Sequence, residues 1–172
     1  MSKIILLGYM GCGKSTIAKS LSQNLQIPFI DLDNYIEERE QMDIKTIFDT
    51  KGEVYFRKVE HQSFLELLHK DENCIIGLGG GTPCYANNHE LLIGEGRTSI
   101  YLKASIDTLF NRLVLEKEKR PLIAGKTDEE MKEFIAIHLF ERSYFYNKAQ
   151  YTVSVDQSVE QIVADINKVL NS

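Results

Sequence analysis

The amino-acid sequence predicts an α/β protein built around a mostly parallel β-sheet. Short apolar runs typical of strands alternate along the chain with longer stretches whose apolar residues recur at helical spacing. Two of the runs, residues 3–7 and 74–78, are apolar at successive positions instead of at every second one. Such strands are expected at the centre of a parallel sheet, where helices cover both faces.

Each expected element follows from its own pattern. Residues 3–8 (KIILLG) predict the first strand, and residues 15–25 predict a helix because an apolar residue recurs at every fourth position. The later strands are predicted, in order, at residues 28–33, 74–79, 98–104 and 151–156. The last helix is expected to begin after Ser158 and to bury an apolar stripe that extends to residue 170.

Length, charge and cysteine content narrow the classes of function. A chain of 172 residues is expected to form one domain, residues 1–172, with a single core. The formal net charge of −5 argues against a general nucleic-acid or membrane binder, whose binding surface is basic. No run predicts a membrane span or a signal peptide, and the three cysteines show no CxxC spacing. We therefore expect a cytoplasmic protein without nucleic-acid or membrane partners, and we expect a monomer.

The stretch GYMGCGKST, residues 8–16, connects the first predicted strand to the first predicted helix. Gly8, Gly13, Lys14 and Ser15 fit the pattern G-x-x-x-x-G-K-[ST] of a phosphate-binding loop, in the structural context that this pattern requires. Backbone N–H groups and the helix N-terminus surround phosphate oxygens in such a loop. Lys14 is expected to reach the β- and γ-phosphates, and the Ser15 hydroxyl to bind Mg²⁺. The alternative is a glycine-rich turn with an incidental lysine.

Polar segments also follow the second and third predicted strands. DLD (residues 31–33) and GLGGGT (residues 77–82) fall at the carboxyl ends of strands, where parallel sheets bind ligands. Asp31 and Asp33 are expected on the same side of an extended strand, facing the phosphate loop. One carboxylate would then bind a water molecule that coordinates magnesium, and the other would accept the proton of a hydroxyl group. The simpler alternative is a solvated strand end, or an N-cap of the next helix.

Two further patterns leave alternatives open. Arg57 and Glu60 lie three residues apart in FRKVE (residues 56–60), where an ion pair along a helix is the simplest explanation. The three glycines at residues 79–81 are costly in chain entropy and serve best where backbone must approach a ligand closely. A plain flexible turn is the alternative for these glycines.

In combination, these motifs resemble those of the shikimate kinase family. The motifs, in the family's order, are GYMGCGKS, DLD, FRKVE, GGGT, RPL (residues 120–122) and RSYFYNKA (residues 142–149). The resemblance extends from the first strand to the last helix. It implies a three-layer α/β/α fold of the nucleoside monophosphate kinase type, with five parallel strands in the order 2-3-1-4-5.

The resemblance also implies an activity. The γ-phosphoryl group of ATP would be transferred, with one Mg²⁺ per subunit, to the 3-hydroxyl of shikimate in the route to chorismate and the aromatic amino acids. Residues from about 33 to 61 would form the shikimate-binding region, and residues from about 112 to 125 a lid that closes on ATP. The alternatives are another kinase of the same fold, acting on gluconate or a nucleoside monophosphate, and a non-catalytic ATP-binding regulatory module.

The family's functional residues carry over to matching positions of this sequence. The residues implied to bind ATP are Gly11, Cys12, Gly13, Lys14, Ser15, Thr16, Arg112 and Arg120. The residues implied to bind shikimate are Asp33, Arg57, Gly79, Gly80, Gly81 and Arg142. Asp33 would be the catalytic base, while Lys14 and Arg120 would balance charge on the transferred phosphoryl group. Ser15 would bind Mg²⁺ directly and Asp31 through water, and Glu60 would orient Arg57.

Cys12 departs from the family's pattern, which commonly has a small or hydroxyl residue in that part of the loop. Because a helix N-terminus can lower the pKa of a nearby thiol, one hypothesis is that Cys12 reacts with alkylating agents and that bound ATP protects it. The alternative is a small neutral filler. The stretch YFY at residues 144–146 is predicted to pack within a helix.

Overall fold

The structure, a computed structural model, describes residues 2–172 and contains one five-stranded parallel sheet. Its strand order is β2-β3-β1-β4-β5, and every neighbouring pair is parallel. The strands are β1 (Lys3–Leu7), β2 (Phe29–Asp31), β3 (Cys74–Gly77), β4 (Arg97–Lys103) and β5 (Tyr151–Ser154). The α/β fold class and the strand order 2-3-1-4-5 are therefore confirmed.

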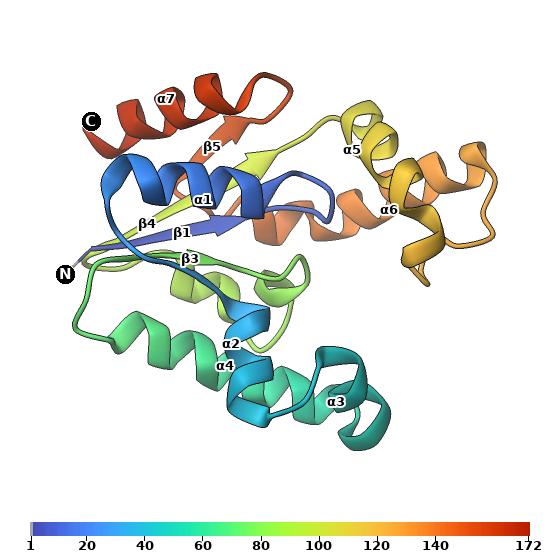
Figure 1. The fold of residues 1–172 in the computed structure, drawn as a ribbon, viewed down its shortest axis with the longest axis horizontal. Helices are drawn as coiled ribbons and strands as arrows, with labels where there is room; N and C mark the ends of the chain where they lie inside the picture. The colour runs from blue at the N-terminus through green and yellow to red at the C-terminus, as the bar shows by residue number, and fades with distance from the viewer. Residues whose placement is uncertain (1) are drawn as a thin grey trace.

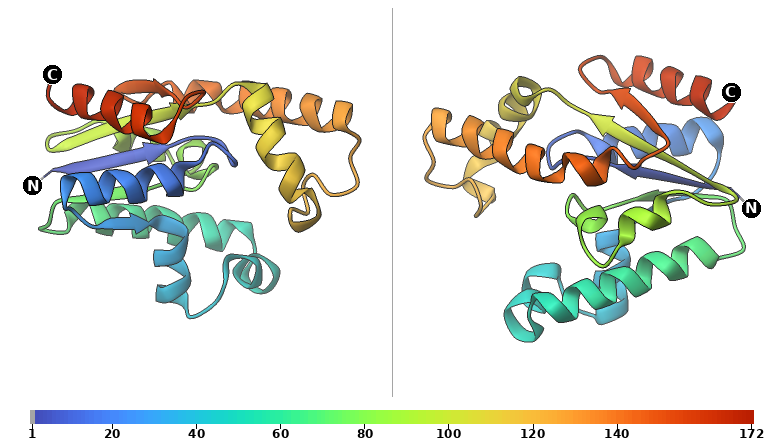
Figure 2. Two further views of the ribbon diagram at one scale, coloured as in Figure 1. Left: turned by 45° about the horizontal axis from the view of Figure 1, so that its top comes forward. Right: turned by 180° about the vertical axis from the view of Figure 1, so that it is seen from behind.

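Helices cover both faces of the sheet. The α-helices are α1 (Lys14–Leu25), α2 (Leu32–Glu40), α3 (Ile44–Lys51), α4 (Glu53–His69), α5 (Ile106–Leu113), α6 (Asp128–Tyr146) and α7 (Val159–Leu170). Short 3₁₀ helices are η1 (Thr82–Cys84), η2 (Asn88–Leu92) and η3 (Val114–Lys119). Helices α1 and α7 pack together on one face, whereas α4 and α6 lie on the opposite side (Figures 1 and 2). The result is the predicted three-layer arrangement.

The hydrophobic core centres on the two middle strands. Every residue of β1 and of β3 is buried, as expected for apolar strands that are covered on both faces. Helix α1 adds Ile17 and Leu21 to this core, and α7 adds Ile162 and Ile166. The apolar stripe of α7 therefore packs as its spacing predicted, and Ser158 caps the helix by accepting a hydrogen bond from the N–H of Gln161.

One charged side chain in this core has a structural use. Lys3, at the start of β1, is 2% exposed, and its ammonium group donates hydrogen bonds to the carbonyl oxygens of Lys70 (2.8 Å) and Glu72. Both carbonyls lie in the connection between α4 and β3. Through these part-buried hydrogen bonds, Lys3 holds that connection against the edge of the sheet away from the phosphate loop.

Strand β2 is shorter than predicted, and this changes the placement of two carboxylates. The strand ends at Asp31, and α2 begins at Leu32. The Asp31 side chain caps α2 by accepting a hydrogen bond from the N–H of Asn34 (3.2 Å). A side chain that satisfies the first turn of a helix favours helix over continued strand. The expectation that Asp31 and Asp33 share one side of an extended strand was therefore wrong: Asp33 lies in the first turn of α2.

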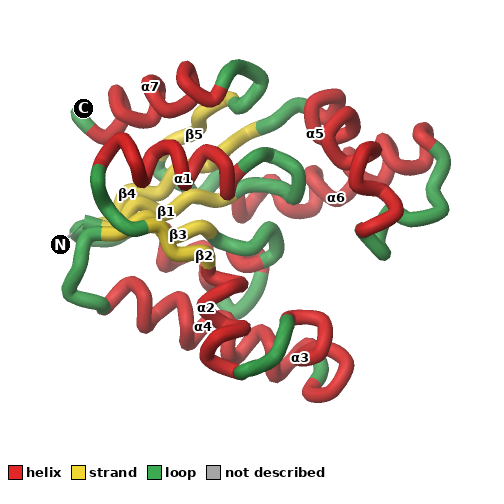
Figure 3. Tube along the Cα trace, in the orientation of Figure 1, coloured by secondary structure: helices red, strands yellow, loops and turns green. Residues whose placement is uncertain are grey.

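The carboxyl edge of the sheet positions the polar motifs. Strands β1 and β3 pair in parallel, so the loops that follow them lie side by side at this edge (Figure 3). Helix α5 and the segment after it lie to one side of these loops, and α2 with α3 lies to the other (Figure 1). Among residues 2–172, none of the helices has the length and hydropathy that a membrane crossing needs.

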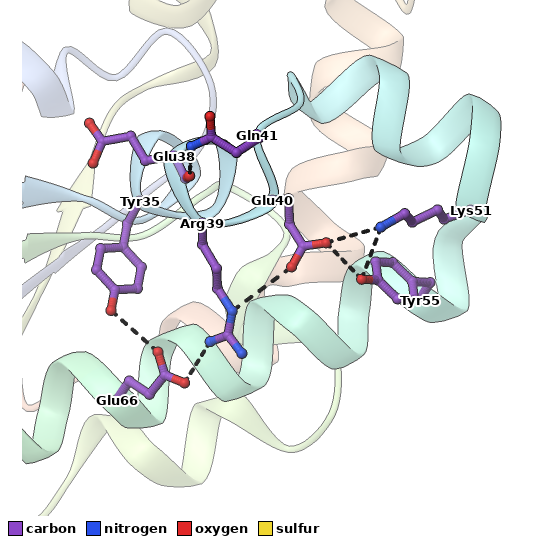
Figure 4. A network of polar contacts seen from close by, with 8 residues as sticks. All are labelled: Tyr35, Glu38, Arg39, Glu40, Gln41, Lys51, Tyr55 and Glu66. Atoms are coloured by element: carbon purple, nitrogen blue, oxygen red, sulfur yellow. Dashed lines mark hydrogen bonds and ion pairs between the residues drawn. The ribbon is translucent and has the colours of Figure 1, made fainter.

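A network of polar side chains joins α2 to α3 and α4 (Figure 4). The carboxylate of Glu40 accepts hydrogen bonds from the hydroxyl of Tyr55 (2.6 Å) and the ammonium group of Lys51 (3.3 Å). On the same helix, Arg39 forms an ion pair with Glu66 of α4 at 2.6 Å. The hydrogen bond from Tyr55 lowers the pKa of Glu40 and favours the charged form of the network. These contacts fix the three helices relative to one another.

Candidate active site

A cavity of about 650 Å³ opens at the carboxyl edge of the sheet. Its walls come from the loop after β1, the start of α2, the glycine turn after β3, and the segment that includes the end of α5. Most of the residues that sequence analysis assigned to a site line this cavity: Gly11, Cys12, Gly13, Lys14, Ser15, Thr16, Asp31, Asp33, Gly79, Gly80, Arg112 and Arg120. Four segments that are distant in sequence thus meet around one space.

The phosphate loop owes its shape to two glycines with positive φ. Gly11 has φ 82° and Gly13 has φ 86°, a region in which an L side chain is strained. Gly13 is also the N-cap of α1, and no side chain caps this end of the helix. The first N–H groups of α1 are therefore available to an anion, and Lys14, the first residue of the helix, adds a positive charge beside them.

Cys12 lies within this loop but is not the exposed thiol that the reactivity hypothesis requires. It is 1% exposed, and burial raises the pKa of its thiol despite the neighbouring Lys14. A neutral thiol with little access to solvent is a poor nucleophile. The lowered pKa on which the reactivity hypothesis depends is therefore contradicted, because desolvation outweighs the opposing effect of Lys14. The alternative, a small neutral filler, agrees with this burial.

Asp33 has the most strongly perturbed carboxylate of the cavity wall. Removal from water raises the pKa of its side chain to about 6, and the nearby carboxylates of Asp31 and Glu60 add to this effect. The ammonium group of Lys14 opposes the increase only in part. A Cβ placed on Gly79 would lie 3.1 Å from Oδ1 of Asp33, so the carboxylate faces the glycine turn. A carboxylate with a pKa near 6 suits a general base at neutral pH.

Arg57, on α4, is held against the glycine turn by a buried carboxylate. Its Nη1 donates to Oε1 of Glu60 at 2.9 Å, and Glu60 is only 1% exposed. The second oxygen of Glu60 accepts a hydrogen bond from the hydroxyl of Thr82 at 2.8 Å. A Cβ on Gly81 would lie 3.2 Å from Nη2 of Arg57. The i, i+3 ion pair is therefore present, and it also positions the guanidinium group beside Gly81.

Arg142, on α6, also approaches this turn. Its Nη1 would lie 3.1 Å from a Cβ on Gly80, and it donates to the hydroxyl of Tyr146 at 3.4 Å. The Tyr146 hydroxyl in turn donates to the carbonyl oxygen of Gly80 at 2.6 Å. Arg57, Gly81 and Arg142 do not line the large cavity themselves. They lie at its end, where two guanidinium groups flank the glycine turn.

Two tyrosines support the site in a way that sequence reasoning missed. Tyr146 is fully buried, as the packing prediction implies, yet its hydroxyl connects Arg142 to Gly80. Tyr9 lines the cavity, its ring lies 5.6 Å from the guanidinium of Arg142, and its hydroxyl shares a 3.0 Å hydrogen bond with Nδ1 of His138. Burial raises the pKa of Tyr9 to about 12, so this hydroxyl stays neutral. No local pattern indicates these contacts, because they join distant segments.

The other side of the phosphate loop carries two more arginines. Arg112 donates from Nη1 to the carbonyl oxygen of Gly11 at 3.2 Å, which places it over the loop. Arg120 forms an ion pair with Glu116 at 2.6 Å on the cavity wall. A second cavity of about 220 Å³ adjoins the loop and is lined by Cys12, Gly13, Thr16, Ile17, Arg112, Val159 and Ile162. Its walls are mainly apolar, with one guanidinium group.

The cavity offers oxygen ligands for a magnesium ion. No cluster of three or more His, Cys, Asp or Glu residues suited to a metal occurs among residues 2–172. Ser15 and Asp31 nevertheless line the same cavity, and Asp31 uses one carboxylate oxygen to cap α2. One hydroxyl and one carboxylate suit Mg²⁺, which keeps several waters and takes its remaining ligands from phosphate oxygens.

Comparisons with known proteins identify the family. The shikimate kinase family model matches residues 10–171. The shikimate kinase of Flavobacterium johnsoniae is 64% identical to this chain over 171 residues, covering 99% of both proteins. The structure of shikimate kinase from Bacteroides thetaiotaomicron has a TM-score of 0.91 at 37% identity, covering 99% of both chains. That of Acinetobacter baumannii shikimate kinase in complex with shikimate has a TM-score of 0.84 at 28% identity, covering 99% of this chain and 93% of the other. This chain therefore belongs to the shikimate kinase family, whose enzymes transfer phosphate to a hydroxyl group of shikimate.

Proposed function

We propose that this kinase transfers the γ-phosphoryl group of ATP to the 3-hydroxyl of shikimate at the junction of the large cavity and the glycine turn. One observation carries the proposal: Asp33 shares a cavity with Lys14 and the phosphate loop, while Arg57 and Arg142 flank the end of that cavity. The proposed base and the proposed polyphosphate site thus share one cavity, and two fixed cations lie beside the glycine turn at its end. An acceptor with a carboxylate at one end and hydroxyl groups at the other matches this arrangement.

The two arginines would bind the carboxylate of shikimate. Guanidinium groups pair with carboxylates through two parallel hydrogen bonds, and both groups are oriented before the ligand arrives. Glu60 orients Arg57, and Tyr146 orients Arg142 beside Gly80. Backbone groups of residues 79–81 then lie next to the bound acid. The region from about 33 to 61 would supply the rest of this site, since α2, α3 and the start of α4 fall within it.

Asp33 would act as the base and the cations as charge stabilisers. Its raised pKa keeps the affinity of the carboxylate for a proton high, which suits it to accept the proton of the attacking 3-hydroxyl. Lys14 and Arg120 would interact with the transferred phosphoryl group, whose charge must be balanced in the transition state. Arg120 is paired with Glu116, so it must exchange that partner for phosphate when residues from about 112 to 125 close over ATP.

Magnesium and adenine have separate places in this scheme. Ser15 would bind Mg²⁺ directly and Asp31 through water, and the ion supplies charge neutralisation at the β- and γ-phosphates when bound. The second cavity would take the adenine ring, because its apolar wall and the guanidinium of Arg112 suit a flat aromatic ligand. Val159 and Ile162 contribute to the apolar part of that wall.

We further propose that the protein acts as a monomer with one catalytic domain. The cytoplasmic location expected from the cysteine content remains a prediction.

Incubating the protein with ATP, Mg²⁺ and one acceptor at a time tests the proposal. We expect acceptor-dependent ADP release with shikimate, giving shikimate 3-phosphate, and none with gluconate or AMP. The Lys14→Ala variant is the matched control that should lose the activity. Preferential phosphorylation of gluconate or AMP would overturn the assignment. Tight ATP binding without ADP release for any acceptor would indicate a regulatory module instead.

A further inference from the structure

The guanidinium group of Arg57 is covered by an aromatic ring that the proposed mechanism does not use. Its central carbon lies 3.7 Å from the ring centroid of Tyr85, a cation–π contact at stacking distance. The rings of Phe56 and Phe48 are farther away, at 5.1 and 6.0 Å. Of these three aromatic neighbours, Tyr85 therefore makes the closest contact with the cation.

Hydrogen bonds alone do not fix the plane of this guanidinium group. Nη1 donates to Glu60, but Nε is buried and makes no hydrogen bond to any of the described residues. The carboxylate of Glu53 lies 3.6 Å from Nε, beyond hydrogen-bond distance. A planar group held by one end turns about that contact unless something packs against its face. The ring of Tyr85 packs against that face of the guanidinium group.

The backbone after Tyr85 adopts an unfavourable conformation. Ala86 and Asn87 are consecutive residues with φ of 49° and 56°. The other non-glycine residues with positive φ in the described chain are Gln26 and Gln41, which end α1 and α2, a common place for this conformation. Ala86 directly follows Tyr85, the C-cap of the 3₁₀ helix η1, and alanine rarely adopts left-handed geometry. Strain of this kind persists where surrounding contacts demand it and is concentrated at functional sites.

Buried hydrogen bonds tie the strained segment to the helix that carries Arg57. Asn88 is fully buried; its side chain donates to the carbonyl oxygen of Thr82 (3.0 Å) and contacts Nδ1 of His61 on α4 (2.7 Å). Its N–H donates to the carbonyl oxygen of Tyr85 at 2.9 Å. Thr82 also donates to the carboxylate of Glu60. The ring and the cation therefore sit on one rigid unit.

Tyr85 itself contributes little to the core, because it is 40% exposed. A Cβ on Gly81 would lie 3.6 Å from the edge of its ring, so the ring also borders the glycine turn. From this placement we infer that Tyr85 is a positioning residue of the acceptor site. It packs on the face of Arg57, sets the plane in which the guanidinium meets the carboxylate of the acceptor, and excludes water from one side of that pair. The inference rests on the proposed function, in which Arg57 binds that carboxylate.

Steady-state kinetics of Tyr85 variants test the inference. Tyr85→Ala should raise the KM for shikimate roughly 5- to 30-fold, the range expected for loss of a partly shielded cation–π contact. The KM for ATP and kcat should change much less. Tyr85→Phe should keep the KM for shikimate near the wild-type value because it keeps the aromatic ring. Tyr85→Leu should raise this KM as Tyr85→Ala does, because leucine fills space but has no π face. Tyr151→Ala, which removes a tyrosine of similar exposure (39%) on β5, is the matched control and should leave the KM for shikimate unchanged.

The outcomes separate this inference from the proposed function. An unchanged KM for shikimate in Tyr85→Ala and Tyr85→Leu overturns the role of Tyr85. So does a Tyr85→Leu variant with the wild-type KM, since apolar packing would then suffice. Arg57→Ala, measured in parallel, tests the function itself. If Arg57→Ala raises the KM and the Tyr85 variants do not, only the inference fails. If Arg57→Ala leaves the KM unchanged, the proposed acceptor site fails.

Discussion

Replacing Asp33 with asparagine should make the protein more stable while removing most of its activity. Partial burial and two nearby carboxylates raise the pKa of Asp33 from 3.8 to about 6. A pKa that is about two units higher in the folded than in the unfolded state means that ionisation of this group costs the folded state about 3 kcal/mol of stability. Asparagine avoids that cost but gives up a favourable acid in the first turn of α2, worth about 0.3–1 kcal/mol. The expected net gain at neutral pH is about 2 kcal/mol.

The size of this effect depends on pH. Because the folded state holds the proton more tightly, stability falls as pH rises from about 4 to 6 and stays lowered above that. Urea unfolding of wild type and Asp33→Asn should therefore differ by about 2 kcal/mol at pH 7.5 and by less than about 1 kcal/mol at pH 4. The control is the Asp43→Asn variant. Asp43 is an exposed helix cap, and its hydrogen bonds with Thr46 lower its pKa, so this variant should be no more stable than wild type.

Activity completes the test of Asp33. If the carboxylate is the base, kcat should fall roughly 10²- to 10⁴-fold in Asp33→Asn, the usual scale for loss of a general base. A fall of less than tenfold would make Asp33 a group that positions the acceptor. An Asp33→Asn protein that is no more stable than wild type at pH 7.5, or whose stability gain is the same at pH 4, would refute the electrostatic reasoning.

Kinetics, thiol labelling and unfolding measurements test four other properties of the site and the core. The kcat/KM for shikimate should rise with pH to a plateau, with an apparent pKa near 6 set by Asp33; a profile that is flat between pH 5 and 7.5 would contradict this. Arg57→Ala and Arg142→Ala should each raise the KM for shikimate while leaving the KM for ATP nearly unchanged, and equal effects on both substrates would remove the arginines from the acceptor site. Iodoacetamide should leave Cys12 unmodified in the native protein and label it in urea, as measured by mass spectrometry; rapid native labelling would show that the thiol is accessible. Lys3→Met should lower the free energy of unfolding by roughly 2 kcal/mol because two part-buried carbonyl oxygens lose a charged donor, and an unchanged urea midpoint would show that water replaces it.

The parts of the fold that sequence could predict are those set by local patterns. Apolar runs gave the strands at the centre of the sheet, and the glycines and lysine at residues 11–14 gave the phosphate loop. The end of β2 was misplaced by two residues because hydrophobic alternation continues through Leu32, while the cap formed by Asp31 ends the strand. A capping hydrogen bond favours the start of a helix over continuation of the strand, and the alternation of apolar residues does not indicate such a bond.

The parts of the site that sequence missed depend on contacts between distant segments. Tyr85 and Tyr146 are separated from their partners Arg57 and Gly80 by many residues, and their own neighbours in sequence predict only a turn and a packed helix. The place of Cys12 before α1 left a lowered pKa and a neutral filler as alternatives, and the burial that raises the pKa comes from tertiary packing. Desolvation also raises the pKa of Asp33, and it depends on the folded structure, so the sequence alone does not predict it.

A crystal structure with shikimate and a non-hydrolysable ATP analogue bound together tests most directly whether the acceptor and the γ-phosphate meet beside Asp33. We expect the 3-hydroxyl within about 2.6–3.2 Å of the Asp33 carboxylate and in line with the γ-phosphate. The carboxylate of shikimate should contact both Arg57 and Arg142. A 3-hydroxyl directed away from Asp33, or a shikimate carboxylate that touches neither arginine, would contradict the proposed mechanism.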